Sequence, residues 1–293
     1  MRRLAWGPMR RAGPLLLLIA MCAWPSSAGA QRPELPRGGT KLFPHFRVVA
    51  FAGTPGVPEL GALGVGSLDS AVKRLRRQAR AYHRSGRPIL PALDLLATIC
   101  SAGPGGDGKF RYRRSVRIVE QHLAAARRAR ALLLIHIQPG RSAFMDELRR
   151  YRRFLSEPDV GIALDPEWRM GPGQRPGEVI GSADSDEINA VSAYMQRVVK
   201  REGLPQKLLV AHQFTPNMIR RRSRVRQRPG VAVTISIDGV GSREQKEGTY
   251  HELAHAGDGL YDGFKLFYEE DGREMTPAQV LALRPQPDFV VYE

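Results

Sequence analysis

The tetrapeptide Asp165-Pro166-Glu167-Trp168 holds the residue types in this chain that are best suited to chemistry. It directly follows an apolar run, residues 160–164, which is typical of a buried parallel strand. Carboxylates two residues apart at a strand end point to the same side. They also reach the edge where parallel α/β folds place their active sites. Paired carboxylates beside an indole suit acid–base chemistry on a polar, ring-shaped substrate such as a sugar.

The elements that must position this tetrapeptide alternate between apolar strand-like runs and amphipathic helical runs. Strict alternation favours an α/β fold with a parallel sheet, and eight units over this length predict one closed (β/α)8 TIM-type barrel over residues 45–293. A doubly wound open sheet is the alternative topology. The predicted strands are residues 47–51, 89–95, 131–137, 160–164, 207–212, 231–237, 264–269 and 288–292. The predicted helices are residues 68–84, 116–128, 143–155, 185–201, 216–222, 243–255 and 276–283.

Polar side chains gather at the C-terminal ends of these predicted strands, and the N-terminal ends show far fewer. In a parallel barrel those ends form one mouth, so we expect these side chains to line a shared substrate site. Two structural alternatives stay open. Asp165 could cap the following turn, and His136 could be a hydrogen-bonded histidine of the barrel interior. The residues expected to bind substrate are Asp94, His136, Gln138, Trp168, His212, Asp238 and Tyr292.

This arrangement resembles the glycoside hydrolase barrels, many of which place a general acid just after the fourth strand and a carboxylate nucleophile at the end of the seventh. The resemblance implies that Glu167 is the acid and Glu269 the nucleophile, with Asp165 as a further catalytic candidate. Trp168 would raise the pKa of the acid and stack on a sugar ring. Glu270 and Asp271 are competing candidates for the role of Glu269. No cofactor is expected for this chemistry.

The chain also resembles secreted barrel proteins of bacteria. Its first 30 residues have the pattern of an export signal, with arginines, an apolar core over residues 15–21 and small residues at 28–30. The apolar run is too short to span a bilayer stably, so we expect a mature protein without a membrane span, secreted or associated with the cell envelope. Residues 31–44 form a Pro/Gly-rich leader. Cleavage would leave Cys100 as the remaining cysteine, which excludes an internal disulfide framework.

The segment His251-Glu252-Leu253-Ala254-His255 is a literal H-E-x-x-H sequence and offers a different chemistry. On a helix the two histidines share one face and can bind zinc, while the glutamate activates a metal-bound water. A zinc metalloprotease is therefore an alternative function, with zinc as its cofactor. We rank it second because the motif falls in a helix of the predicted outer layer, which faces away from the strand ends.

The formal net charge of +16 comes mostly from arginine. The densest basic run, residues 220–228, could bind anionic polymers of the envelope. No aromatic residue interleaves with this run, so a nucleic acid is not the favoured partner. A carbohydrate or another small polar molecule is the favoured partner of the strand-end site. The remaining alternative is a non-catalytic barrel that binds the envelope through its basic face.

Overall fold

The structure is a computed structural model that describes Met1 and residues 32–83, 86–254, 257 and 259–293. The export signal expected over residues 1–30 falls outside the described residues, apart from Met1. Residues 32–293 form one compact unit, so the leader after residue 31 belongs with the barrel. In the described part of this unit, eight parallel strands make up the barrel. They are β1 (Arg47–Gly53), β2 (Ile89–Cys100), β4 (Leu132–Ile137), β5 (Val160–Leu164), β7 (Lys207–Gln213), β9 (Val231–Ile237), β10 (Tyr261–Leu266) and β11 (Phe289–Tyr292).

The sheet closes on itself because β1 pairs with strands on both of its sides. Val48 of β1 lies beside Leu90 of β2 and beside Phe289 of β11, and both pairings are parallel. The remaining strands follow in chain order from β2 to β4, β5, β7, β9, β10 and β11. This closure confirms the predicted (β/α)8 barrel and excludes the open doubly wound sheet.

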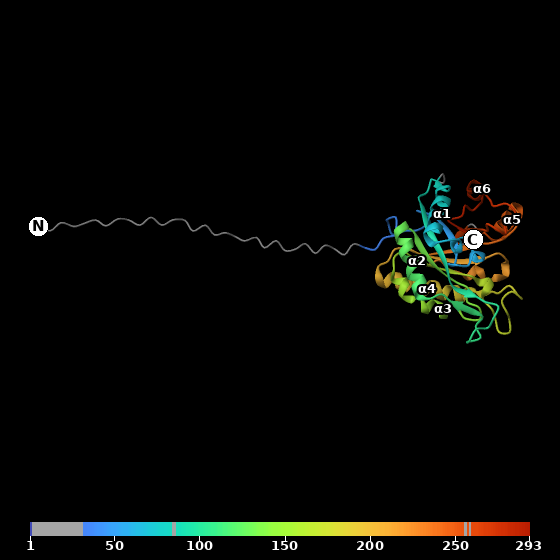
Figure 1. Ribbon diagram of the computed structural model, residues 1–293. Helices are drawn as coiled ribbons and strands as arrows, with labels where there is room; N and C mark the ends of the chain where they lie inside the picture. The colour runs from blue at the N-terminus through green and yellow to red at the C-terminus, as the bar shows by residue number, and fades with distance from the viewer. Residues whose placement is uncertain (2–31, 84–85, 255–256, 258) are drawn as a thin grey trace. The chain divides into compact units, whose positions relative to one another are not determined.

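Helices lie outside the strands, and Figure 1 shows α2, α3 and α4 grouped on one side of the barrel, away from α5 and α6. The amphipathic pattern explains this placement, since α1 buries Ala71, Leu75 and Ala79 at every fourth position. No helix in the described ranges has both the length and the apolar character that crossing a membrane requires. The helices are α1 (Leu68–Arg80), α2 (Val116–Ala129), α3 (Phe144–Arg150), α4 (Ser185–Glu202), α5 (Arg243–Leu253) and α6 (Pro277–Ala282).

Short strands and 3-10 helices lie in the segments that connect the barrel strands and the helices. β3 (Arg111–Arg113) pairs antiparallel with the end of β2, and β6 (Ala183–Asp184) pairs with β8 (Ile219–Arg220). Six short 3-10 helices complete the described secondary structure: η1 (Pro58–Leu60), η2 (Ala62–Gly64), η4 (Arg152–Ser156), η5 (Pro166–Trp168), η6 (Pro216–Met218) and η7 (Arg222–Arg224).

Several predicted elements differ from the structure, and three of them contain predicted site residues or motifs. The seventh strand covers residues 261–266 rather than 264–269, because Gly263 packs against Ser236 inside the barrel instead of forming a turn. The helix expected over residues 216–222 is replaced by η6, β8 and η7. The helix expected to reach residue 255 ends at Leu253, and Ala254 is extended with φ −77° and ψ 122°.

Apolar side chains form two separate cores because successive residues of a barrel strand point to opposite faces. Val49 and Phe51 belong to the outer core between strands and helices, and Val48 and Ala50 belong to the core inside the barrel. Both cores are continuous over many strands. The inner core fills the barrel at the end where the strands begin.

The leader closes the end of the barrel at which the strands begin. Its side chains Leu35, Leu42 and Phe43 are buried in the inner core. The amide nitrogens of Leu42 and Phe43 donate to Gln206 Oε1 at 2.8 and 3.1 Å, just before β7 begins. The leader is therefore a plug of the barrel rather than a free linker.

Truncating this plug is expected to destabilise the protein. Leu42→Ala removes a fully buried side chain and leaves a cavity, so we expect the free energy of unfolding to fall by about 2–5 kcal/mol. The measurement is a urea denaturation curve of each protein. Val65→Ala is the control, since Val65 is 43% exposed and its truncation should change stability by less than about 0.5 kcal/mol. Equal effects of the two substitutions would show that the leader does not fill the barrel.

Candidate functional site

The mouth cluster is a layer of polar side chains at the end of the barrel where the strands finish. Strand alternation places it there, since Leu208, Val210 and His212 of β7 all point inward, and the last of them is polar. Nearly all of the cluster is buried. Its members are Asp94, His136, Gln138, Asp165, His212, Ser236, Asp238, Lys265 and Glu293. The structure therefore brings together six predicted site residues, Asp94, His136, Gln138, Asp165, His212 and Asp238.

His136 bridges two buried carboxylates. Its Nδ1 lies 3.3 Å from Asp94 Oδ2, and its Nε2 lies 3.4 Å from Asp165 Oδ2. Gln138 Nε2 donates to the same Asp165 oxygen at 3.1 Å. Burial alone would lower the pKa of His136, but the two carboxylates outweigh burial and raise the pKa to about 10. A doubly donating imidazolium is consistent with both contacts, so His136 is the hydrogen-bonded interior histidine that the sequence left open.

Asp165 and Glu167 have pKa values displaced in opposite directions. Burial opposes ionisation of Asp165, but the hydrogen bond and charge of His136 prevail and lower its pKa to about 2. Burial, followed by the negative charge of Asp165, raises the pKa of Glu167 to about 8. Asp165 makes no side-chain capping bond to η5, so the capping alternative does not apply. Near neutral pH Asp165 is thus ionised while Glu167 carries a proton.

A second polar chain crosses the mouth from β7 to β11. His212 Nδ1 lies 2.6 Å from Asp238 Oδ2, and Ser236 Oγ donates to Asp238 Oδ1 at 2.8 Å. Lys265 Nζ lies 2.7 Å from Glu293 Oε2 and 3.8 Å from Asp238 Oδ2. Burial disfavours the charge of Lys265, but these carboxylates outweigh it and raise its pKa. Lys265 is therefore a charged ammonium group held by the carboxylates of Asp238 and Glu293.

Asp94, His136 and His212 also offer ligand atoms that lie within 4.8 Å of one another, close to the spacing of a metal site. His212 Nε2 is buried and has no hydrogen-bond partner among the described residues. However, the two imidazole rings stack, with centroids 4.8 Å apart and planes at 11°. The in-plane lone pairs of parallel rings run side by side, whereas zinc requires nitrogens that converge at about 2.0–2.1 Å. The arrangement could hold a cation only after one ring turns.

Three predicted site residues lie elsewhere or have a different setting. Glu269 is exposed in the turn after β10 and lines a small hollow beside Glu293, because β10 ends three residues earlier than predicted. Tyr292 points outward, where its hydroxyl lies 2.6 Å from the hydroxyl of Tyr82, because alternation along β11 turns it away from the mouth. Trp168 is half-buried in η5, and its indole nitrogen is buried with no partner in the described ranges.

Lys265 and Glu293 were absent from the predicted site. Lys265 was hidden by the misplaced seventh strand. Once β10 is placed over residues 261–266, Tyr261, Gly263 and Lys265 share the inward face. The two-residue period places Lys265 and Glu269 on the same face, so the position of the strand end is what selects the lysine. Glu293 directly follows the predicted eighth strand, but its ion pair with Lys265, which marks it as part of the site, is a contact between strands that the sequence does not show.

The H-E-x-x-H segment is not contained in one described helix. His251 and Glu252 are exposed on α5, which ends at Leu253, and His255 lies outside the described residues. The basic run is largely bound to the protein itself. Arg221 pairs with Asp184 and Asp186, and Arg222 donates to the carbonyl oxygen of Leu253. Arginine density in the sequence therefore does not locate an open anion site.

The closed strand pairing and its polar mouth define a protein of the (β/α)8-barrel class. No protein-family model matches the chain, and no curated protein matches it. Among solved structures, the chain is similar to the cellulose synthase subunit Z (CcsZ) from Clostridioides difficile, with 8% sequence identity and a TM-score of 0.35. That match covers 74% of this chain and 83% of the other. The fold assignment rests on the strand pairing described above.

Proposed function

We propose that this barrel acts on a carbohydrate by paired-carboxylate chemistry at its mouth, with Glu167 as the general acid and Asp165 as its ionised partner. The observation that carries the proposal is the opposite displacement of the two pKa values in carboxyl groups two residues apart. Such divergence separates acid and base roles in enzymes. The export-signal pattern makes a glycan of the cell envelope or the environment the substrate class.

Each group has a defined task in this proposal. Glu167 donates its proton to the oxygen of the glycosidic bond as that bond breaks. Asp165, held ionised by His136, stabilises the positive charge that develops on the sugar ring in an oxocarbenium-like transition state. The half-buried indole of Trp168 provides an apolar face for the ring.

Two mouth carboxylates can act as the second carboxylate of a glycosidase, the role that the resemblance gave to Glu269. Asp238 and Glu293 both help to raise the pKa of Glu167, so their charges reach it through the mouth. Both are ion-paired with Lys265. Glu293 is the more accessible of the two, with 24% of its side chain exposed against 7% for Asp238. We therefore assign to Glu293 the attack on the anomeric carbon as the glycosidic bond breaks. A water molecule, deprotonated by Glu167, then displaces Glu293 from that carbon and restores the proton of Glu167.

The proposal is tested by incubating the full chain with neutral and acidic glycans and measuring the release of reducing ends against pH. Glu167 must be protonated to act, and it carries its proton below its pKa of about 8. Turnover should therefore be constant near neutrality and fall about tenfold per pH unit above about pH 8. A chelator should leave turnover unchanged. Absence of cleavage and binding for every glycan, a rate that rises through pH 8, or loss of turnover on chelation would each contradict the proposal.

A further inference from the structure

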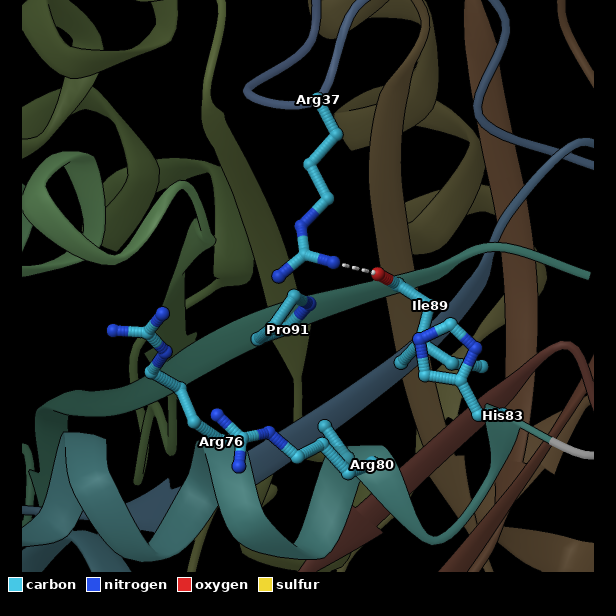
Figure 2. A pocket seen from close by; sticks show the side chains of 7 residues that line it. Arg37, Arg76, Arg80, His83, Ile89 and Pro91 are labelled. Atoms are coloured by element: carbon cyan, nitrogen blue, oxygen red, sulfur yellow. Dashed lines mark hydrogen bonds between the residues drawn. The ribbon is translucent and has the colours of Figure 1, made fainter.

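A small cavity lies at the end of the barrel opposite to the mouth, between the leader and the last turn of α1 (Figure 2). Its volume is about 120 Å³. The floor is apolar, and cationic side chains reach over it from two sides, with Arg37 coming from the leader and Arg76 and Arg80 from α1. The complete lining is Arg37, Arg76, Ala79, Arg80, His83, Ile89 and Pro91.

Arg37 is held in position by main-chain oxygens rather than by an acid. Its Nη1 donates to the carbonyl oxygen of Ile89 at 2.7 Å, the bond drawn in Figure 2, and its Nε donates to that of Arg130 at 3.3 Å. Arg130 Nε in turn donates to the carbonyl oxygen of Pro36 at 3.1 Å. These bonds fix the direction of the guanidinium and leave its positive charge without a counter-ion.

The positive charge of this cavity is uncompensated. No carboxylate lines it, and no ion pair of Arg37, Arg76 or Arg80 occurs within the described part of the chain. Burial, followed by the positive charges of Arg130 and Arg76, lowers the pKa of Arg37. The cations of this region therefore lie close enough to repel one another. The C-terminal dipole of α1 offers only about half a negative charge against three guanidinium groups. Arg76 and Arg80 also stand at i and i+4, a spacing at which like charges weaken a helix.

We propose that this cavity binds a phosphate group, either as inorganic phosphate or as the head of a phosphate ester. Guanidinium groups match phosphate oxygens with paired donors. A tetrahedral anion can accept bonds from arginines on two sides at once, whereas a planar carboxylate has only two oxygens to share. The volume is well below the roughly 300–1,000 Å³ of pockets that enclose drug-sized ligands, so one anionic group fits and the rest of an ester projects outward. The apolar floor of Ala79, Ile89 and Pro91 suits the first carbons of such an ester.

This inference does not depend on the proposed carbohydrate chemistry, because the cavity lies at the other end of the barrel. It also places anion binding in this cavity rather than at the basic run 220–228, which the sequence suggested. The run 220–228 has much of its charge paired with Asp184 and Asp186, whereas the guanidinium groups of the cavity have no such partners.

The test is calorimetric titration of the full chain with sodium phosphate and, separately, with glycerol 1-phosphate at constant ionic strength. We expect both to bind, and the double variant Arg76→Gln/Arg80→Gln to bind at least about tenfold more weakly, because charge-assisted hydrogen bonds are lost. Glutamine retains helix propensity at these exposed positions, so the variant should fold. Tighter binding of the glycerol ester would identify an ester as the ligand, and equal binding would identify phosphate itself.

The matched control is Arg224→Gln/Arg226→Gln, which removes the same charge from two exposed positions of the basic run. Its affinity for both ligands should stay within about twofold of the wild type. Saturating phosphate should raise the melting temperature of the wild type and of the control but not that of the cavity variant. Failure of the wild type to bind either ligand, or equal losses in the two double variants, would overturn the proposal.

Discussion

Glu167→Gln is expected to lower kcat on the glycan substrate by about 10²–10⁴-fold, with KM changed little. Glutamine has the shape of the protonated acid but no proton to give, so substrate still binds while the leaving oxygen departs unprotonated. The high-pH fall of the wild-type profile should also disappear from whatever turnover remains, because the group with a pKa of about 8 is gone. The measurement is steady-state kinetics of both proteins across pH.

The control for this prediction is Glu269→Gln, since Glu269 is an exposed carboxylate of the turn after β10. Its kcat should stay within about twofold of the wild type. An aryl glycoside with an acidic phenol as leaving group needs little protonation, so Glu167→Gln should lose much less activity on it. A variant at position 167 with full activity, or an equal loss at position 269, would refute the assignment of the acid.

Glu147→Gln is expected to cause a large loss of stability, because it removes a buried charge that two arginines share. Glu147 is fully buried on α3, where Arg111 Nε lies 2.8 Å from Oε1 and Arg113 Nε lies 2.7 Å from Oε2. Removing one partner of a buried ion pair leaves the other charge buried and uncompensated, which lowers the free energy of unfolding by about 3–5 kcal/mol. Because 31% of the Arg113 side chain is exposed, we expect about 3 kcal/mol, measured as a lower free energy of unfolding in urea.

The pH dependence of this loss has a definite sign. Burial would raise the pKa of Glu147, but the hydrogen bonds from Arg113 and Arg111 outweigh burial and lower it. The stabilisation is therefore present above the unfolded-state pKa and is lost as pH falls through the lower folded-state value. The difference between wild type and variant should shrink in acid. Glu120→Gln, which removes an exposed partner of Arg153, should cost less than about 1 kcal/mol, and a comparable cost would contradict the prediction.

The strands and their closure could largely be predicted from sequence because apolar runs flanked by helical periodicity are a strong signal. The exceptions have a physical cause. β10 begins with Tyr261-Asp262-Gly263, which has the composition of a turn, but these residues pair with β9, where Gly263 lies beside Ser236. β2 continues well past its predicted end, since a register shift at Leu96 carries it into the hairpin with β3.

Much of the candidate site could also be predicted, since residue type and strand-end position selected Asp165 and His136. What the sequence lacks is the exact end of each strand, which decides which residue of the inward face lies at the mouth. Because β10 ends at Leu266, Lys265 lies at the mouth and Glu269, four residues further on, lies beyond the strand; in β11, alternation turns Tyr292 outward. The opposite pKa displacements of Asp165 and Glu167 depend on burial and on partners from other strands, which no local pattern encodes.

The barrel closes through the pairing of β1 with β11, so closure must wait until β11 has been synthesised. Val48 pairs with Phe289, so the ring joins segments separated by nearly the whole described domain. A nascent chain exposes the unpaired edges of β1 and β10 until β11 has left the ribosome, and strand edges of this kind recruit other chains. Folding also loses the conformational entropy of that long loop before the pairing of β1 with β11 contributes any stabilisation. Chaperone protection of the nascent chain should therefore raise the soluble yield.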